Sequence, residues 1–216
     1  MDKQVLSWYG LGRDAPVHEY SKTIWERGDL HMHTTCSDGE NTYEEMVQAS
    51  LELGFDFIAI TDHGICQDVA QACRQETRLL CIPGQEVGGN VHMVALGIRQ
   101  EISHGLSVKE MVRLIHEQGG FAIAAHPYNF SPNYTDEEMF QSGLDARECQ
   151  ADGEFNRLVN GEWVKIDIPE IPCVYGRDAH SAKDLGIHYG ECDADIHTYD
   201  DLITAIKAFK CHAPIW

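Results

Sequence analysis

The chain has 216 residues, and its 43% hydrophobic and 24% charged side chains lie close to the averages for globular proteins. This length fits one domain with a single hydrophobic core. The formal net charge is −19, from 16 basic and 35 acidic side chains. Because proteins that bind nucleic acids usually carry a basic surface, this charge predicts that no long nucleic acid is a partner. No apolar run reaches the roughly 18 residues of a membrane-crossing helix, so we expect no membrane association.

The first 27 residues differ in sequence pattern from the rest of the chain. Residues 1–27 carry scattered aromatic side chains without a regular pattern, and we expect an N-terminal arm that packs on a body of residues 28–216. The start, Met1 to Gln4, lacks the basic and apolar segments of a signal peptide, which predicts a cytoplasmic protein.

The eight cysteines form no C-x-x-C pair, and in the cytoplasm we expect reduced, mostly buried thiols. The oligomeric state stays open.

From Gly28 onward, strand-like and helix-like segments alternate. In chain order we expect a strand at 29–34, a helix from the capping box of Thr42 and Glu45 to Gly54, a strand at 55–61, a helix at 67–78, strands at 79–86 and 91–96, a helix from the capping box of Ser107 and Glu110 to Gly119, a strand at 121–125, a helix at 136–141, strands at 144–148 and 171–175, and a helix at 200–210. Residues 149–170 carry no readable pattern. The alternation predicts a parallel α/β sheet, open or closed into a barrel, with functional groups at the C-terminal ends of its strands.

Histidine is unusually frequent, at 12 residues, and the first two candidates lie on the first strand. His31 and His33 are separated by one residue, and a strand has a period of two, so both rings point to the same face and can share a metal. The Ser37-Asp38-Gly39 turn would present a carboxylate beside this pair.

Further candidates follow later strands. His63 comes directly after the strand at 55–61, where the adjacent Asp62 is explained by turn formation. Glu86 ends the next strand, and a buried acidic residue there needs a cation or hydrogen-bond donors. His126 ends the apolar strand before Pro127. His92 opens the strand at 91–96, where a core histidine is an alternative interpretation.

Asp178 and His180 repeat the alternate spacing near the end of the last strand. The complete set of candidate metal ligands is His31, His33, Asp38, His63, Glu86, His92, His126, Asp178 and His180. A single catalytic zinc uses about three protein ligands, so this set predicts two or three divalent ions. Imidazole and carboxylate ligands suit Zn, Mn or Fe.

Seven motifs, in order, resemble those of the PHP family, the polymerase and histidinol phosphatase superfamily of metal-dependent phosphoesterases. They are D-L-H-M-H-T, S-D-G, I-T-D-H-G, G-Q-E, V-H-M-V-A-L-G, A-A-H-P and R-D-A-H-S, between Gly28 and Leu185. The resemblance implies a distorted (β/α)7 barrel with two or three metals at the C-terminal ends of the strands.

The resemblance also implies how the ligands divide. One metal would be held by His31, His33, Glu86 and Asp178, a second by Glu86, His92 and His126, and a third by Asp38, His63 and His180. Asp38 stands where some relatives have a histidine, and Arg177 where many have a small residue. The arginine either adds a phosphate contact or is only tolerated at the edge of a loop.

The implied activity is hydrolysis of a small phosphate ester, such as a nucleotide, a short oligonucleotide or a metabolite phosphate, by a metal-activated water. Asp178 would act with the metals, and His180 or His63 could protonate the leaving alcohol. Arg177 and Lys183 are the basic residues that flank the last motif, so they are candidates for contact with the substrate phosphate.

Two alternatives stay open. An amidohydrolase-type enzyme also begins with H-x-H, but it usually needs a lysine at a strand end, and no lysine lies between Lys22 and Lys109. A non-catalytic metal-binding module is the second alternative, although such modules usually lose ligand residues.

Overall fold

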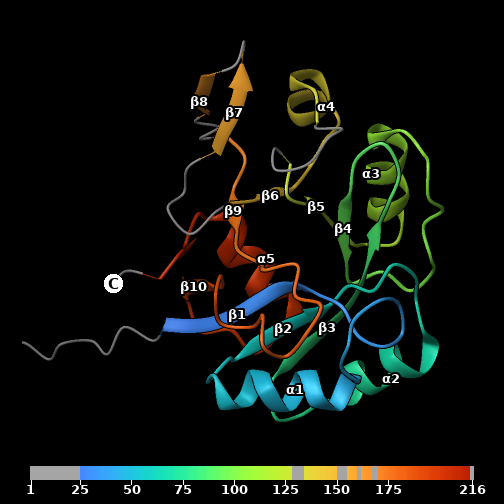
Figure 1. Cartoon of the computed structure of the whole chain (residues 1–216), viewed down its shortest axis with the longest axis vertical. Coiled ribbons are helices and arrows are strands. Elements are labelled where there is room, and N and C mark those ends of the chain that lie inside the picture. The colour runs from blue at the N-terminus through green and yellow to red at the C-terminus, as the bar shows by residue number, and fades with distance from the viewer. Residues whose placement is uncertain (1–24, 128–133, 150–154, 160–161, 167–169, 215–216) are drawn as a thin grey trace, which may run out of the picture.

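The computed structural model describes residues 25–127, 134–149, 155–159, 162–166 and 170–214 (Figure 1). Residues 1–24 of the expected arm lie outside this range, and residues 25–27 begin the first strand. The elements are β1 (Trp25–Met32), α1 (Tyr43–Glu52), β2 (Phe57–Ile60), α2 (Gln67–Gln75), β3 (Leu80–Val87), β4 (Met93–Leu96), α3 (Val108–Glu117), β5 (Phe121–Ala124), α4 (Asp136–Gln141), β6 (Ala146–Glu148), β7 (Phe155–Val159), β8 (Glu162–Ile166), β9 (Cys173–Val174), β10 (Gly190–Asp193), α5 (Tyr199–Lys207) and β11 (Cys211–His212).

One mixed sheet of nine strands, in the order β11-β10-β1-β2-β3-β4-β5-β6-β9, carries the fold. The segment after β9 returns to the other side of this sheet, where Ala179 forms a parallel bridge with Met32 of β1. The Ala179 N–H donates to the carbonyl of His31 at 3.1 Å, and its carbonyl accepts from the N–H of His33 at 2.8 Å. The sheet is therefore nearly closed into a barrel.

The expectation of a parallel sheet is correct for β1, β2 and β3 and for β5, β6 and β9. It is wrong for β4, which runs antiparallel to both of its neighbours. Residues 88–92, which join β3 to β4, are too few for a crossover helix, so the chain turns back directly. Strands β7 and β8 form a separate hairpin, and β10 and β11 add an antiparallel edge beside β1. A regular (β/α)7 repeat is thus absent from the described part of the chain.

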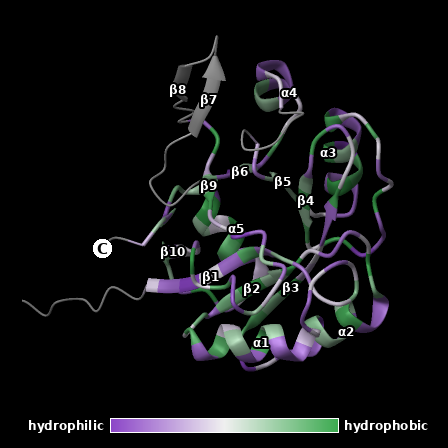
Figure 2. Cartoon of the chain, viewed as in Figure 1, coloured by the Kyte–Doolittle hydropathy of each residue, from purple (hydrophilic) through white to green (hydrophobic). Residues whose placement is uncertain are grey.

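The helices begin where the sequence places their caps. Thr42 and Glu45 form the expected capping box of α1. Ser107 caps α3, but the Glu110 carboxylate pairs with Arg113 instead of completing a box. Figure 2 shows hydrophobic and hydrophilic residues alternating along α1, as expected for a helix with one face on the sheet.

The core follows from this amphipathic pattern. Helix α1 buries Met46 and Val47 against Ile58 of β2, and α3 buries Met111 and Ile115 in a second cluster. Full burial of such a side chain contributes about 1.5–3 kcal/mol to folding. The core therefore fixes the strands whose ends carry the candidate ligands.

All eight cysteines are paired, which corrects the expectation of reduced thiols. The disulfides are Cys36–Cys66, Cys73–Cys81, Cys149–Cys173 and Cys192–Cys211. Cys73 of α2 and Cys81 of β3 are eight positions apart, whereas the other three pairs are separated by 19 to 30 positions. Among the described residues, no helix has the length and apolar content of a membrane-crossing segment. A cytoplasmic location stays a prediction.

Candidate metal centre

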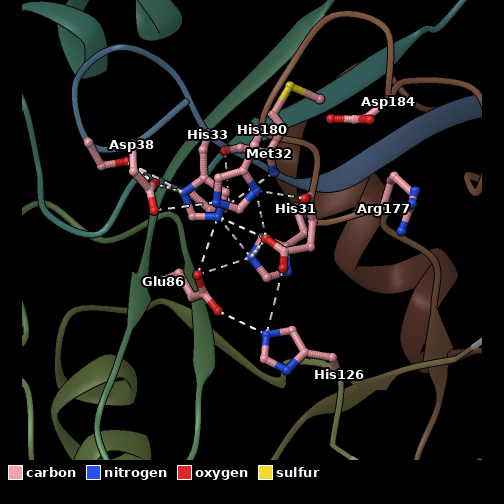
Figure 3. Close-up of polar contacts among 12 residues, drawn as sticks. His31, Met32, His33, Asp38, Glu86, His126, Arg177, His180 and Asp184 are labelled. Atoms are coloured by element: carbon pink, nitrogen blue, oxygen red, sulfur yellow. Dashed lines mark hydrogen bonds and ion pairs between the residues drawn. The ribbon is translucent and has the colours of Figure 1, made fainter. Parts of the chain in front are cut away.

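The first group of candidate ligands surrounds the end of β1. His31 and His33 are buried and point to the same side, with their Nε2 atoms 3.3 Å apart, as the strand period predicts. Oδ1 of Asp178 lies 3.0 Å from Nε2 of His33 and 3.3 Å from Nε2 of His31. Oε2 of Glu86 lies 3.2 Å from Nε2 of His33 and 3.4 Å from Nε2 of His31. Figure 3 shows the side chains of His31, His33 and Glu86 converging on one another.

The second group is built on the other oxygen of Glu86. Its Oε1 lies 2.7 Å from Nδ1 of His92 and 3.1 Å from Nε2 of His126. His92 precedes β4 rather than following it, yet it reaches the same end of the barrel because β4 is antiparallel. The two oxygens of one buried carboxylate thus face two ligand groups, which is the geometry of a bridging ligand.

The third group is the most exposed and centres on Asp38. Oδ2 of Asp38 lies 3.3 Å from Nε2 of His63 and 3.4 Å from Nε2 of His180. Oδ1 of the same carboxylate lies 3.5 Å from Nδ1 of His33, so His33 lies between the first and third groups.

All nine predicted side chains thus lie in three groups, and within each group the ligand atoms lie within 4.8 Å of one another. Carboxylate oxygens and imidazole nitrogens without thiolate are a donor set that suits Zn, Mn or Fe. The residues present therefore fit a cluster of divalent cations. Their role as metal ligands stays a prediction.

Two of these residues have unusual backbone conformations. His126 has a φ of 27° and Asp178 a φ of 56°, both in the left-handed region. Such conformations cost about 1–3 kcal/mol for residues other than glycine, and they concentrate at functional sites. Gly176 supports this segment at close range, because a Cβ there would lie 2.9 Å from Cβ of His31. The fold therefore holds the ends of β5 and β9 in conformations that aim these side chains at the cluster.

Opposite charges in the cluster shift its pKa values. Burial alone would lower the pKa of His33, but hydrogen bonds with Asp178 and Glu86 outweigh burial and raise the pKa to about 9. Burial alone would raise the pKa of Asp178, but His33 and His31 lower it to about 2. The imidazoles, His31 foremost, also hold the pKa of Glu86 below its usual range despite its burial. Both carboxylates are therefore ionised at neutral pH and attract cations.

Two buried carboxylates that support the ligands were not predicted. Oε1 of Glu148 lies 2.6 Å from Nδ1 of His31. Asp29 accepts the backbone N–H groups of His31 and Arg177, and its burial raises its pKa to about 7. Both residues lie on predicted strands, but the sequence offers no motif that pairs either one with His31.

Asp62 does more than form the turn expected of it. Its carboxylate accepts hydrogen bonds from the N–H and the hydroxyl of Thr34, at 2.7 Å and 2.8 Å. It also accepts one from the hydroxyl of Ser37 at 2.7 Å. Asp62 thus anchors the loop that carries Asp38.

A pocket of about 320 Å³ opens over the cluster. It is lined by members of all three groups and by further residues such as Asn90 and Tyr134. Arg177 and Lys183 are exposed, and neither is among the described residues that line the pocket. Arg177 also stands apart from the cluster in Figure 3. Their assignment as substrate contacts stays a prediction.

A sequence profile of the PHP domain matches residues 29–169, and a PHP-associated profile matches residues 169–211. The chain belongs to the PHP domain family. The family resemblance drawn from the ordered motifs is thereby confirmed.

The PHP relatives include proteins with and without a stated activity. The chain is 26% identical over 170 residues to an uncharacterized protein of Methanocaldococcus jannaschii, covering 70% of this chain and 99% of that protein. It is 38% identical over 87 residues to the 5′-3′ exoribonuclease Rnm of Escherichia coli, covering 36% of this chain and 29% of that enzyme. The chain thus matches less than a third of Rnm.

Solved structures share the fold at low identity. The lesion-specific endonuclease Q of Pyrococcus furiosus superposes with a TM-score of 0.67 and 14% identity, covering 86% of this chain and 56% of that one. A second endonuclease Q structure, which contains a 27-mer duplex substrate, has a TM-score of 0.60 and 13% identity, covering 87% and 57% of the two chains.

The prediction that no long nucleic acid is a partner is wrong, and the expectation of a small phosphorylated partner falls with it. A PHP relative is an exoribonuclease, and a protein of the same fold holds a 27-mer duplex. The physical reason is that net charge sums the whole surface, whereas a phosphate responds to charges within a Debye length of about 8–10 Å. Near a metal cluster, the metal ions dominate that local field.

Proposed function

We propose that this chain is a metal-dependent phosphoesterase that hydrolyses phosphodiester bonds of nucleic acids. The observation that carries the proposal is the arrangement around Glu86, whose two oxygens face separate ligand groups at the floor of one open pocket. Multinuclear sites of this kind suit in-line displacement at phosphorus.

The nine side chains of the three groups would hold two or three divalent ions. Such ions supply an activated water and neutralise charge that develops on the phosphoryl oxygens. The groups contain three carboxylates, from Asp38, Glu86 and Asp178, so three divalent ions would leave a net positive pocket. This local charge explains how a chain of net charge −19 can accept a polyanion.

The chain's own residues would orient the substrate and move the proton. His63 and His180 line the pocket and are partly exposed, so either ring can reach a bound substrate. A ring that is not fully engaged by metal would protonate the leaving oxygen. Asp178 also lines the pocket, and it has a left-handed backbone that places Oδ1 3.0 Å from Nε2 of His33.

The choice of a nucleic acid rests on the relatives. Rnm, with 38% identity over the shared segment, is an exoribonuclease, and endonuclease Q shares the fold. The pocket has a volume of about 320 Å³, which lies within the range of ordinary ligand pockets and would accommodate one end of a nucleic-acid strand.

The test is a substrate panel with the protein loaded with Mn²⁺ or Zn²⁺. It should contain single-stranded RNA and DNA oligomers with and without a 5′ phosphate, cyclic phosphodiesters, phosphomonoesters, amides and carboxyl esters. We expect cleavage of the oligomers above all other classes. Turnover of amides or carboxyl esters alone would favour the amidohydrolase alternative, and inactivity of the fully loaded chain on every class would favour a non-catalytic module.

A further inference from the structure

Glu148 ends β6 and carries a buried carboxylate that touches two different candidate ligands. Its Oε1 lies 2.6 Å from Nδ1 of His31. Its Oε2 accepts the backbone N–H of His126 at 2.6 Å. Among the described residues the three ligand groups do not include Glu148 itself, so it supports two groups from outside.

The contact with His31 determines which ring nitrogen carries the proton. Nε2 of His31 faces the cluster, 3.3 Å from Oδ1 of Asp178. For Nε2 to offer a lone pair to a metal, the proton of the neutral ring must sit on Nδ1. The Glu148 carboxylate accepts that proton in a hydrogen bond, which fixes the ring orientation and raises the basicity of Nε2.

The contact with His126 holds a backbone that is unfavourable by itself. His126 has a φ of 27°, and the hydrogen bond from its N–H to Glu148 stabilises the residue in this conformation. In that position Nε2 of His126 lies 3.1 Å from Oε1 of Glu86. Loss of the hydrogen bond would free the residue to turn its ring away.

We propose that Glu148 is a positioning residue that serves two metal sites at once, through the tautomer of His31 and the backbone of His126. The inference rests on the metal binding proposed above. Both partners of Glu148 are donors, so both of its oxygens must accept. A carboxylate meets this demand, whereas an amide offers only one oxygen and would turn its NH2 group towards one of the two donors.

The variant Glu148→Gln tests the proposal, with Glu191→Gln as a matched control. Glu191 is a similarly buried carboxylate on β10, where it pairs with Arg27 at 2.9 Å. Calorimetric titration with Mn²⁺ and Zn²⁺ should show a loss of affinity of about 10–100-fold in E148Q and wild-type affinity in E191Q. In ¹⁵N-histidine NMR spectra of the loaded protein, His31 should carry its proton on Nδ1 in the wild type and lose this single tautomer in E148Q.

The variant Glu148→Asp keeps both oxygens on a shorter side chain, and we expect it to recover part of the affinity that E148Q loses. Should E148Q fail to fold, E148D decides, because an E148D variant that loses the single His31 tautomer and still binds metal with wild-type affinity would contradict the proposal. Wild-type affinity and an unchanged His31 tautomer in E148Q would contradict it as well. A wild-type chain that binds neither metal would contradict the proposed function itself.

Discussion

His33 and Asp178 are separated by 145 positions in the sequence, yet Nε2 of one lies 3.0 Å from Oδ1 of the other. The contact forms because the segment after β9 closes the barrel against the end of β1 through the bridge of Ala179 with Met32. The bridge that closes the barrel therefore also brings Asp178 to the histidines at the end of β1.

His33 belongs to two of the three ligand groups, so its loss should be more harmful than that of a peripheral ligand. We expect His33→Ala to lower kcat/KM for phosphodiester cleavage by about 1000-fold or more, which corresponds to about 4 kcal/mol of transition-state stabilisation. His116→Ala removes an exposed histidine of α3 that pairs with Asp145, and it should leave kcat/KM unchanged. Equal kcat/KM values in the two variants would show that His33 has no role in the reaction.

Glu86, like His33, belongs to two ligand groups, and we expect its loss to empty two metal sites together. Its two oxygens face different groups, whereas His92 belongs to one group only. We therefore expect Glu86→Gln to lose two metal ions per chain and His92→Ala to lose at most one, measured by elemental analysis after gel filtration. An E86Q variant with wild-type metal content would argue against a bridging carboxylate.

Metal binding should release protons at neutral pH. Because hydrogen bonds with Asp178 and Glu86 raise the pKa of His33 to about 9, the ring of the chelator-treated protein is charged at pH 7.5. A metal binds only the neutral ring, so the proton must leave, and affinity should rise with pH up to about 9 and level off above it. Calorimetry in buffers of different ionisation enthalpy measures the release. A binding enthalpy independent of the buffer would contradict this expectation.

The disulfide Cys36–Cys66 joins the two loops that carry Asp38 and His63. Replacing both cysteines by serine should lower the free energy of unfolding by about 3–4 kcal/mol and weaken metal binding by the third group. Removal of the Cys192–Cys211 disulfide at the β10–β11 edge should cost a similar free energy without changing metal content.

Denaturant unfolding and elemental analysis of the two double variants separate these effects. Equal metal content in both would show that the first disulfide does not support the site. Mass spectrometry after alkylation without reductant should also find no free thiol among the eight cysteines.

Much of the fold could be predicted because local signals and tertiary structure agree. The capping box of Thr42 and Glu45 starts α1 as expected, and apolar runs mark the central strands. Strand direction could not be predicted, because an apolar run such as that of β4 has the same sequence pattern in a parallel and in an antiparallel strand. Strand β1 begins four residues earlier than expected because Trp25 to Gly28 pair with β10, which carries no strong strand pattern.

The candidate ligands could be predicted because each lies beside a readable strand end in an ordered motif. Their supporting residues could not, since Glu148 reaches His31 only through barrel closure and has no neighbouring motif. The same holds for the disulfides, because cysteine spacing does not reveal which pairs the fold brings together. The net charge led to the wrong prediction that no long nucleic acid is a partner, because it sums the charges of the whole surface and does not describe the local charge of the pocket.

The most direct test of the central claim is the rate of bis(p-nitrophenyl) phosphate hydrolysis by chelator-treated protein as Mn²⁺ or Zn²⁺ is titrated back. We predict no hydrolysis without metal and a rate that rises to a plateau at two or three ions per chain. Hydrolysis that the chelator does not affect, or none at all at full metal occupancy, would contradict a metal-dependent phosphodiesterase.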